Sequence, residues 1–266
     1  MPIRITSHSN PAIKRIGSLR DKKHRRAEGR FLAEGLRICA EAVEAGQVPE
    51  QLVYAEASGG HPLVLRLVAT VEAAGGTAIE TTPDILTKLT GKDNPQAVLG
   101  VFRARVTALT DLDRHSAPMW VVAENLKDPG NLGTMLRTCD ATGAGGVILL
   151  DASCDPFSVE AVRASMGALF TREVVQTDGA AFLAWLRQGE GMLVGASLEA
   201  AVDYQAVRYA APTFVFMGNE QSGLPADYAE ACDALVKLPM RGKADSLNVA
   251  VACAVLLYEV LNQARA

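Results

Sequence analysis

The chain has 266 residues, of which 49% are hydrophobic and 21% charged, with a formal net charge of −4. This composition excludes a disordered or fibrous protein and is typical of one or two globular domains with filled cores. The longest apolar run, residues 249–257, is far shorter than the roughly 20 residues of a membrane helix, and the first 15 residues lack the apolar core of a secretory signal. We therefore predict a cytoplasmic protein without a membrane span.

The cysteines are odd in number and form no C-x-x-C pair; they are Cys39, Cys139, Cys154, Cys232 and Cys253. This pattern fits small buried thiols in a reducing compartment better than disulfides or metal ligands. We predict no metal site.

Charge is distributed unevenly along the chain. Residues 1–30 carry nine Lys or Arg against two Asp or Glu, a net of +7, whereas the rest of the chain has a net charge of −11. A solvated helix face is the common explanation of such a run, but a basic arm on an acidic body is also typical of a protein that meets nucleic-acid phosphates at one end. The candidate RNA-binding cations are Lys14, Arg15, Arg20, Lys22, Lys23, Arg25, Arg26 and Arg30.

The first part of the chain alternates helices and strands. Residues 9–23 begin with Asn-Pro and place Ile13, Ile16 and Leu19 on one stripe, which predicts a surface helix. Further helices are predicted at 36–46, 62–76 and 83–91, and strands at 29–35, 51–56, 77–82 and 97–105. This alternation predicts a compact α/β domain over residues 1–106, followed by a polar linker over 107–118.

The second part, residues 119–266, continues the alternation with short, branched, apolar strands. These are predicted at 119–124, 146–150, 173–176, 192–197, 213–218 and 234–239, with helices at 129–143, 158–169, 180–188, 225–233 and from about 246. Such strands are typical of a parallel sheet covered on both faces. In such sheets the site lies at the carboxyl ends of the strands, which selects the loops after Glu124, Met217 and Met240.

The first of these loops leads into a helix. Asn131 is predicted to be the N-cap, and Arg137 follows in the second turn, so that both approach one cavity mouth. The glycines at 143–146 follow the helix rather than precede it, which indicates helix termination and not a dinucleotide-binding loop.

The second and third loops add polar groups to apolar surroundings. In GNEQSGLP (218–225), Gly218 lets the backbone approach a ligand, Asn219 and Glu220 supply polar groups, and Gly223 allows a reversal; a solvent-exposed turn is an equal alternative. The helix after the third loop is apolar on all faces over 247–257, which predicts burial all round. Ser246 is its predicted N-cap, and the amide of Asn248 then needs a partner, either a neighbouring loop or a ligand.

In order, the three loops resemble the motifs of the SpoU (TrmH-type) RNA 2′-O-ribose methyltransferases over residues 119–262. The matching sequences are N-x5-R-T-C-D-A-T-G-A, F-M-G-N-E-Q-S-G-L and L-P-M-x-G-x3-S-L-N-V-A-V-A. Residues 10–35 also resemble the accessory substrate-binding domain of members that modify ribosomal RNA. The resemblance implies a C-terminal parallel-sheet SPOUT domain with a deep trefoil knot, a smaller N-terminal α/β (L30e-like) domain, and a homodimer formed through the knotted domain.

The resemblance also implies a reaction, the transfer of a methyl group from S-adenosylmethionine to a ribose 2′-hydroxyl, in ribosomal RNA. The cofactor-binding residues would be Gly218, Asn219, Gly223, Leu224, Leu238, Met240 and Leu247. The catalytic residues would be Asn131, Arg137, Glu220, Ser246 and Asn248. Because an arginine is almost always protonated, two roles stay open for Arg137: removal of the proton, or a phosphate clamp while another group accepts it.

Other functions remain as alternatives. A transfer RNA methyltransferase of the same family would more often lack the N-terminal domain. A non-catalytic RNA-binding ribosome-assembly protein would be expected to lose some of the polar residues, all of which are present. A nucleotide-binding enzyme is least favoured, because the chain has no G-x-x-x-x-G-K-[ST] sequence.

Overall fold

The structure is a computed structural model that describes residues 2–200 and 202–265. Contacts between Cα atoms divide the chain into two compact units. The first combines Met1–Arg105 with Phe157–Thr171, and the second combines Val106–Pro156 with Arg172–Ala266. The second domain was predicted as one continuous range, 119–266, whereas residues 157–171 lie in the first unit.

The first unit is built on a mixed sheet. In the described residues its strand order is β1 (Ile3–Ile5), β4 (Thr77–Thr81), β3 (Gln51–Ala55), β5 (Val98–Arg103) and β2 (Arg30–Glu34). β1, β4 and β3 run parallel, whereas β5 is antiparallel to both β3 and β2. Its helices are α1 (Pro11–Ser18), α2 (Lys22–Glu28), α3 (Leu36–Glu44), α4 (Pro62–Ala73), α5 (Pro83–Thr90) and α7 (Val159–Ser165).

Aromatic packing explains why residues 157–171 join this unit. The Phe157 ring lies 5.0 Å from that of Phe31, and the Phe170 ring lies 4.7 Å from that of Phe102, between ring centroids. These rings lie in the interior, where large aromatic side chains bury much apolar surface. The pattern of a single helix at 158–169 carried no signal of this destination.

The second unit contains the parallel sheet that the sequence predicts. Among the described residues its order is β10 (Val202–Asp203), β12 (Ala234–Lys237), β9 (Met192–Ala196), β11 (Thr213–Met217), β6 (Met119–Glu124), β7 (Gly146–Leu150) and β8 (Glu173–Thr177). Every neighbouring pair is parallel. The central strands β6, β7 and β11 are buried along their whole length, as strands covered on both faces must be.

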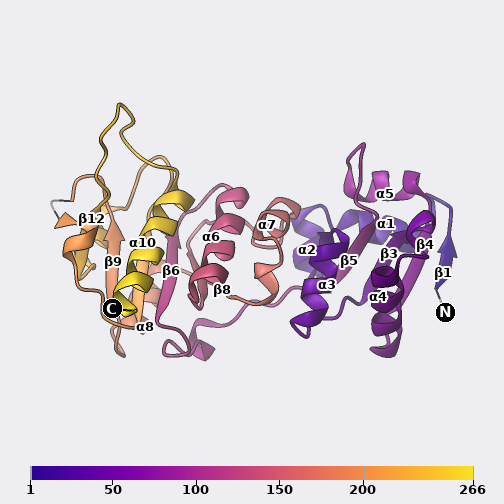
Figure 1. Cartoon of the computed structure of the whole chain (residues 1–266), viewed down its shortest axis with the longest axis horizontal. Coiled ribbons are helices and arrows are strands. Elements are labelled where there is room, and N and C mark those ends of the chain that lie inside the picture. Colours follow the sequence, from indigo (N-terminus) through magenta and orange to yellow (C-terminus); the bar gives the residue numbers. More distant parts are fainter. Residues whose placement is uncertain (1, 201, 266) are drawn as a thin grey trace. The chain divides into compact units, whose positions relative to one another are not determined.

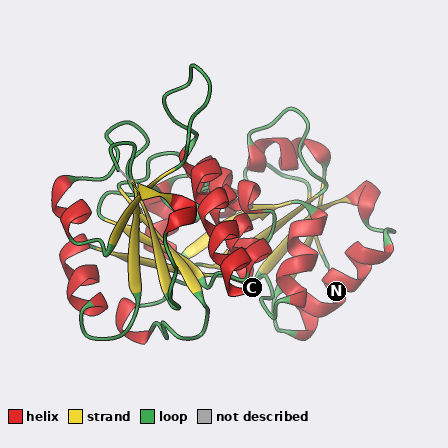
Figure 2. Ribbon diagram, turned by 60° about the vertical axis from the view of Figure 1, so that its left-hand side comes forward, coloured by secondary structure: helices red, strands yellow, loops and turns green. Residues whose placement is uncertain are grey.

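Helices cover both faces of this sheet, as Figure 2 shows. They are α6 (Pro129–Thr142), α8 (Gly179–Leu186), α9 (Ala226–Glu230) and α10 (Val249–Ala264). Trp120, Phe182, Phe214 and Phe216 form a core on one face of the sheet. Separately from this core, α6 packs along α10 (Figure 1). The sheet order brings the carboxyl ends of β9, β11, β6 and β12 together at one edge.

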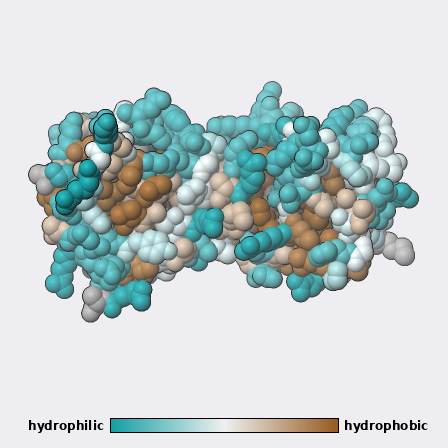
Figure 3. All heavy atoms as spheres, turned by 45° about the horizontal axis from the view of Figure 1, so that its top comes forward, coloured by the Kyte–Doolittle hydropathy of each residue, from teal (hydrophilic) through white to brown (hydrophobic). Residues whose placement is uncertain are grey.

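Two predicted helices differ from the expectation. The helix predicted over 9–23 is two helices, because α1 ends at Ser18 and Asp21 caps α2 by accepting the N–H of Lys23 at 2.7 Å. The last helix is not buried all round: Leu247, just before it, is 40% exposed, and Val251 and Tyr258 on it are 48% and 53% exposed. Figure 3 shows hydrophobic residues gathered on the surface of the second unit.

No helix in residues 2–200 and 202–265 is long and apolar enough to cross a membrane.

Candidate active site

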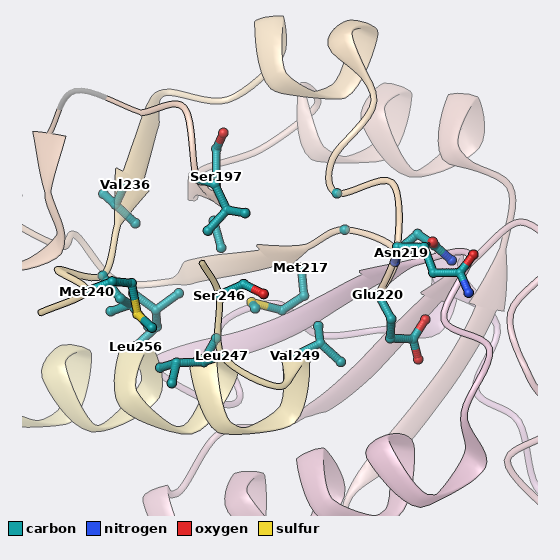
Figure 4. A pocket seen from close by; sticks show the side chains of 17 residues that line it. Ser197, Met217, Asn219, Glu220, Val236, Met240, Ser246, Leu247, Val249 and Leu256 are labelled. Carbon is teal, nitrogen blue, oxygen red and sulfur yellow. Dashed lines mark hydrogen bonds between the residues drawn. The ribbon is translucent and has the colours of Figure 1, made fainter. Parts of the chain in front are cut away.

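A cavity of about 190 Å³ opens at the carboxyl edge of the second sheet (Figure 4). Apolar side chains, including Met240, Leu247 and Leu256, gather at one end, and Glu220 and Asn219 lie at the other. The lining residues are Ala196, Ser197, Leu198, Met217, Gly218, Asn219, Glu220, Gln221, Gly223, Val236, Leu238, Met240, Ser246, Leu247, Val249, Ala252 and Leu256. An apolar slot with polar groups at one end suits an adenosine carrying a charged sulfonium.

Most of the predicted cofactor residues line this cavity; Leu224 does not. Its side chain packs against the aromatic core beside β9, where a Cβ on Gly195 would lie 2.9 Å from it. Ser197 and Leu198, which follow β9, also line the cavity and were not predicted as site residues. Their only signal is their place after a strand, and they reach the cavity because β9 pairs with β11.

Glu220 is the centre of the polar end. Its carboxylate accepts the N–H of Lys127 at 3.2 Å, the N–H of Asp128 at 3.1 Å and Nδ2 of Asn131 at 3.2 Å. Partial burial raises the pKa of Glu220, but the backbone N–H groups of Asp128, Glu220 and Lys127 and the Asn131 amide outweigh it, so that the pKa is lowered overall. The carboxylate therefore binds the loop after β6 in its ionised form.

Two predicted helix caps are wrong in the same way. Asp128, not Asn131, caps α6, because its carboxylate accepts the N–H of Gly130 at 2.6 Å and Pro129 provides the first helical residue. Asn248, not Ser246, caps α10, its Oδ1 accepting the N–H groups of Ala250 and Val251 at 3.0 and 3.3 Å. Both amides therefore lie at the starts of helices, where they can form a hydrogen bond with each other.

The amides of these two helix starts join Glu220 in a chain. Nδ2 of Asn248 donates to Oδ1 of Asn131 at 2.9 Å, and Asn131 in turn donates to Glu220. Since Oδ1 of Asn248 is occupied by the cap, the direction of the whole chain is fixed. The partner that Asn248 required is therefore a residue of the protein, Asn131 in the first turn of α6.

Gly218 has a structural reason for being glycine. A Cβ on residue 218 would lie 2.3 Å from the carbonyl carbon of Gly223, because Asn219 and Gly223 exchange two backbone hydrogen bonds of 3.0 Å. Gly223 itself has a φ of +70°, which only glycine adopts readily. The loop closes on its own backbone, which requires glycine at 218, and Gly218 also lines the cavity.

Arg137 and Ser246 take different places from the amide chain. Ser246 lines the cavity. Arg137 is exposed on α6, about 9 Å along the helix axis from Asn131, and is absent from the cavity lining. Within the described residues its guanidinium forms no hydrogen bond or ion pair, so it is available to an incoming phosphate.

The basic arm divides into structural and available cations. Arg25 is only 6% exposed and its guanidinium donates to the carbonyls of Leu19 and Arg20, which fixes the turn between α1 and α2. Arg15 pairs with Glu28 at 2.8 Å and Arg30 with Glu50 at 2.6 Å. The exposed cations are Lys14, Arg15, Arg20, Lys22, Lys23 and Arg26. Arg25 is therefore not among the cations that we propose for RNA binding, because its guanidinium is buried and bonded within the protein.

Comparison with known proteins matches both units. The SpoU rRNA Methylase family matches residues 118–258, and the MRM3-like substrate binding domain matches residues 10–100. The chain is 30% identical to the 23S rRNA (guanosine(2553)-2′-O)-methyltransferase RlmP of Bacillus subtilis, over 96% of this chain and 98% of the relative. It is 31% identical to the 23S rRNA (uridine(2479)-2′-O)-methyltransferase of Streptomyces viridochromogenes, over 98% and 92%.

Solved structures agree with these matches. An AdoMet-bound rRNA methyltransferase from Sinorhizobium meliloti superposes with a TM-score of 0.91 at 38% identity, covering 97% of both chains. The SpoU methyltransferase AviRb of Streptomyces viridochromogenes, in complex with AdoMet, gives a TM-score of 0.88 at 28% identity, covering 97% of this chain and 99% of that one. With a parallel sheet, three converging loops and a family match over more than half its length, this chain belongs to the SpoU rRNA methylase family.

Proposed function

We propose that this protein transfers a methyl group from S-adenosylmethionine to a ribose 2′-hydroxyl of ribosomal RNA. The observation that carries the proposal is the meeting of three loops from distant parts of the sequence. They form an apolar cavity with the chain Glu220–Asn131–Asn248 at its polar end. Relatives named as 23S rRNA 2′-O-methyltransferases align over nearly the whole chain, including the first unit, which supports ribosomal over transfer RNA.

The residues of the cavity fit the cofactor. Met217, Leu238, Met240, Leu247 and Leu256 offer apolar contact for an adenosine, and the main chain of 218–223 offers hydrogen-bonding groups beside them. Bound S-adenosylmethionine supplies a methyl group activated by a positive sulfonium. The contribution of the protein is to exclude water from the cavity and to place the ribose oxygen in line, and such positioning supplies much of a rate enhancement.

The polar chain orients the substrate and does not remove its proton. A carboxylate with a lowered pKa that already accepts three N–H groups is a weak base, so Glu220 acts as an anchor. Asn131 and Asn248 each keep a second amide hydrogen for a ribose or phosphate oxygen. Arg137 remains either the proton acceptor or a phosphate clamp that leaves the proton to another group.

The exposed arm, the knot and a homodimer belong to the same proposal. Lys14, Arg15, Arg20, Lys22, Lys23 and Arg26 would contact RNA phosphates in the cytoplasm. A deep trefoil knot would be formed by the loops at 218–223 and 238–248. A second copy would cover the exposed apolar stripe of α10, which places Val251 and Tyr258 on one face.

The first test is methyl transfer itself. Purified protein is incubated with radiolabelled S-adenosylmethionine and undermodified ribosomal or transfer RNA, beside Arg137→Ala and the matched control Arg187→Ala, an exposed residue at the end of α8. Label in an alkali-resistant linkage of ribosomal RNA, lost about a hundredfold or more in Arg137→Ala only, is expected. Label in transfer RNA alone would support the other family function. RNA binding without any label would support a non-catalytic ribosome-assembly protein.

A further inference from the structure

The side chain of Asn219 is occupied within the protein. Its Oδ1 accepts the backbone N–H groups of Gln221 at 2.9 Å and Ser222 at 3.2 Å, and lies 3.3 Å from the Ser222 hydroxyl. Its Nδ2 donates to the backbone carbonyl of Asn125 at 2.9 Å. The first set of bonds shapes the loop 218–223, and the last bond leaves that loop altogether.

The Asn125 carbonyl belongs to the segment that holds Glu220. Asn125 directly follows β6 with a φ of +50°, a conformation in which its carbonyl faces the neighbouring loop. Two and three residues later, the N–H groups of Lys127 and Asp128 bind the Glu220 carboxylate. Consecutive residues of one loop, Asn219 and Glu220, therefore bind the other loop at adjacent points and with opposite polarity: one donates and the other accepts.

Beneath this contact, where β6 pairs with β11 up to Ala123 and Met217, lies a buried carboxylate. Glu124, the last residue of β6, is 7% exposed, and its Oε2 has no hydrogen-bond partner among the described residues. Burial and then the charge of Asp151 raise the pKa of Glu124, against the opposing effects of Lys127 and the Asn219 N–H. Asp151 accepts hydrogen bonds from the Tyr228 hydroxyl and from the N–H of Gly179, and its charge repels that of Glu124.

We propose that Asn219 is a positioning residue of the methyl-transfer site: its amide ties the loop 218–223 to Asn125 and so sets the place of Glu220 against Asn131. This revises the expectation that the Asn219 side chain binds the cofactor. The inference rests on the proposed function for its effect on rate, whereas the tie itself is a property of the protein and is measured separately.

Asn219→Asp tests the tie with almost no change of shape. The carboxylate keeps an acceptor for Gln221 and Ser222 but places a charged oxygen against the Asn125 carbonyl, so the donated bond is lost and a negative charge is added. Gln188→Glu is the matched control, because it makes the same change of charge on an exposed residue of the second unit. Asn219→Ser is the second variant: its short hydroxyl does not reach Asn125, and it adds no charge should the aspartate prevent folding.

Three readouts separate positioning from cofactor contact. In Asn219→Asp, kcat is expected to fall about tenfold to a hundredfold, as misplacement of an aligned group does, with S-adenosylmethionine affinity within about threefold of the original. The rate relative to the original protein should recover as pH falls, because protonation of the introduced carboxyl group restores a donor. Amide hydrogen exchange of residues 125–131 should quicken in both Asn219 variants and not in Gln188→Glu.

Opposite results would overturn the inference. Unchanged exchange in both Asn219 variants would show that the tie is not needed, whether or not the protein methylates RNA. A loss of S-adenosylmethionine affinity that accounts for the whole loss of rate would show that the Asn219 side chain binds the cofactor. If the original protein methylates no RNA while the exchange result holds, the proposed function fails and the tie stands.

Discussion

At the scale of single residues, the site depends on a charge that is held by backbone groups. Glu220 accepts two backbone N–H groups and one side-chain amide, and Asn131 and Asn248 extend that bonding to the start of α10. No cation pairs with the carboxylate within the described residues. Its bonds therefore depend on its being ionised, and on the loops after β6 and β11 keeping their separation.

Glu220 gives the site an acidic limit. Its pKa is lowered in the folded protein, so the stabilisation it provides is present above the ordinary carboxyl range and is lost as pH falls through the lowered pKa. Methyl transfer by the original protein should decline on the acid side for this reason. Rates measured from about pH 8 down to about pH 3, on RNA that is stable in that range, check the decline.

Glu220→Gln should remove this decline at acid pH and should also lower the rate of methyl transfer. The glutamine places an amide donor where a carboxylate accepted three N–H groups, so we expect kcat to fall by about tenfold or more at neutral pH. Glu230→Gln, at the exposed end of α9, is the control and should behave like the original protein. An acid limb of the same size in Glu220→Gln would assign it to another group.

At the scale of elements, α10 has one face in the core and another in solvent. Ala250, Cys253 and Leu257 are buried, whereas Val251 and Tyr258 are exposed on a stripe with helical spacing. Few polar residues interrupt this stripe, and an exposed apolar face of this kind is typical of an interface.

Val251→Asp should turn the proposed dimer into a monomer. In a single copy the new carboxylate points to solvent and is tolerated, but in a dimer it would be buried without a partner, which costs several kcal/mol. Sedimentation of the variant beside Leu65→Asp, an equally exposed apolar residue of α4, checks this. A Val251→Asp variant that sediments like the original protein contradicts the proposed interface.

At the scale of the whole molecule, the first unit carries the cations and the second carries the cavity. The exposed cations of α1 and α2 sit on a chain whose remainder is acidic. Their electrostatic attraction to RNA should be independent of sequence and strongly dependent on salt.

Lys22→Ala with Lys23→Ala should weaken RNA binding without affecting the cofactor cavity. If both contact phosphates, the slope of log K against log salt falls by about one to two, at ~0.7–0.9 per phosphate. Arg66→Ala with Arg187→Ala removes the same charge elsewhere and should leave the slope unchanged. Equal slopes in the two double variants would contradict binding by the arm.

Arg25→Ala, by contrast, should lower the unfolding temperature, since it removes the hydrogen bonds from the Arg25 guanidinium to the carbonyls of Leu19 and Arg20.

The sequence by itself determined most of the strands and helices and the three loops of the site, but not the short edge strands β1 and β10. Strands that are apolar over almost their whole length, such as residues 119–124 and 213–217, are typical of a parallel sheet covered on both faces. The carboxyl ends of such strands lie at the same edge of the sheet. Ordered motifs in those loops were enough to indicate the family and its cofactor.

Tertiary structure decided what depends on neighbours distant in sequence. The pairing of β9 with β11 brought Ser197 and Leu198 to the cavity, and aromatic packing carried Phe157 and Phe170 into the first unit. The burial of Arg25 likewise depends on the turn between α1 and α2, whose carbonyls its guanidinium binds. Local patterns report periodicity and caps, whereas strand order and side-chain partners follow from packing between segments that the sequence separates.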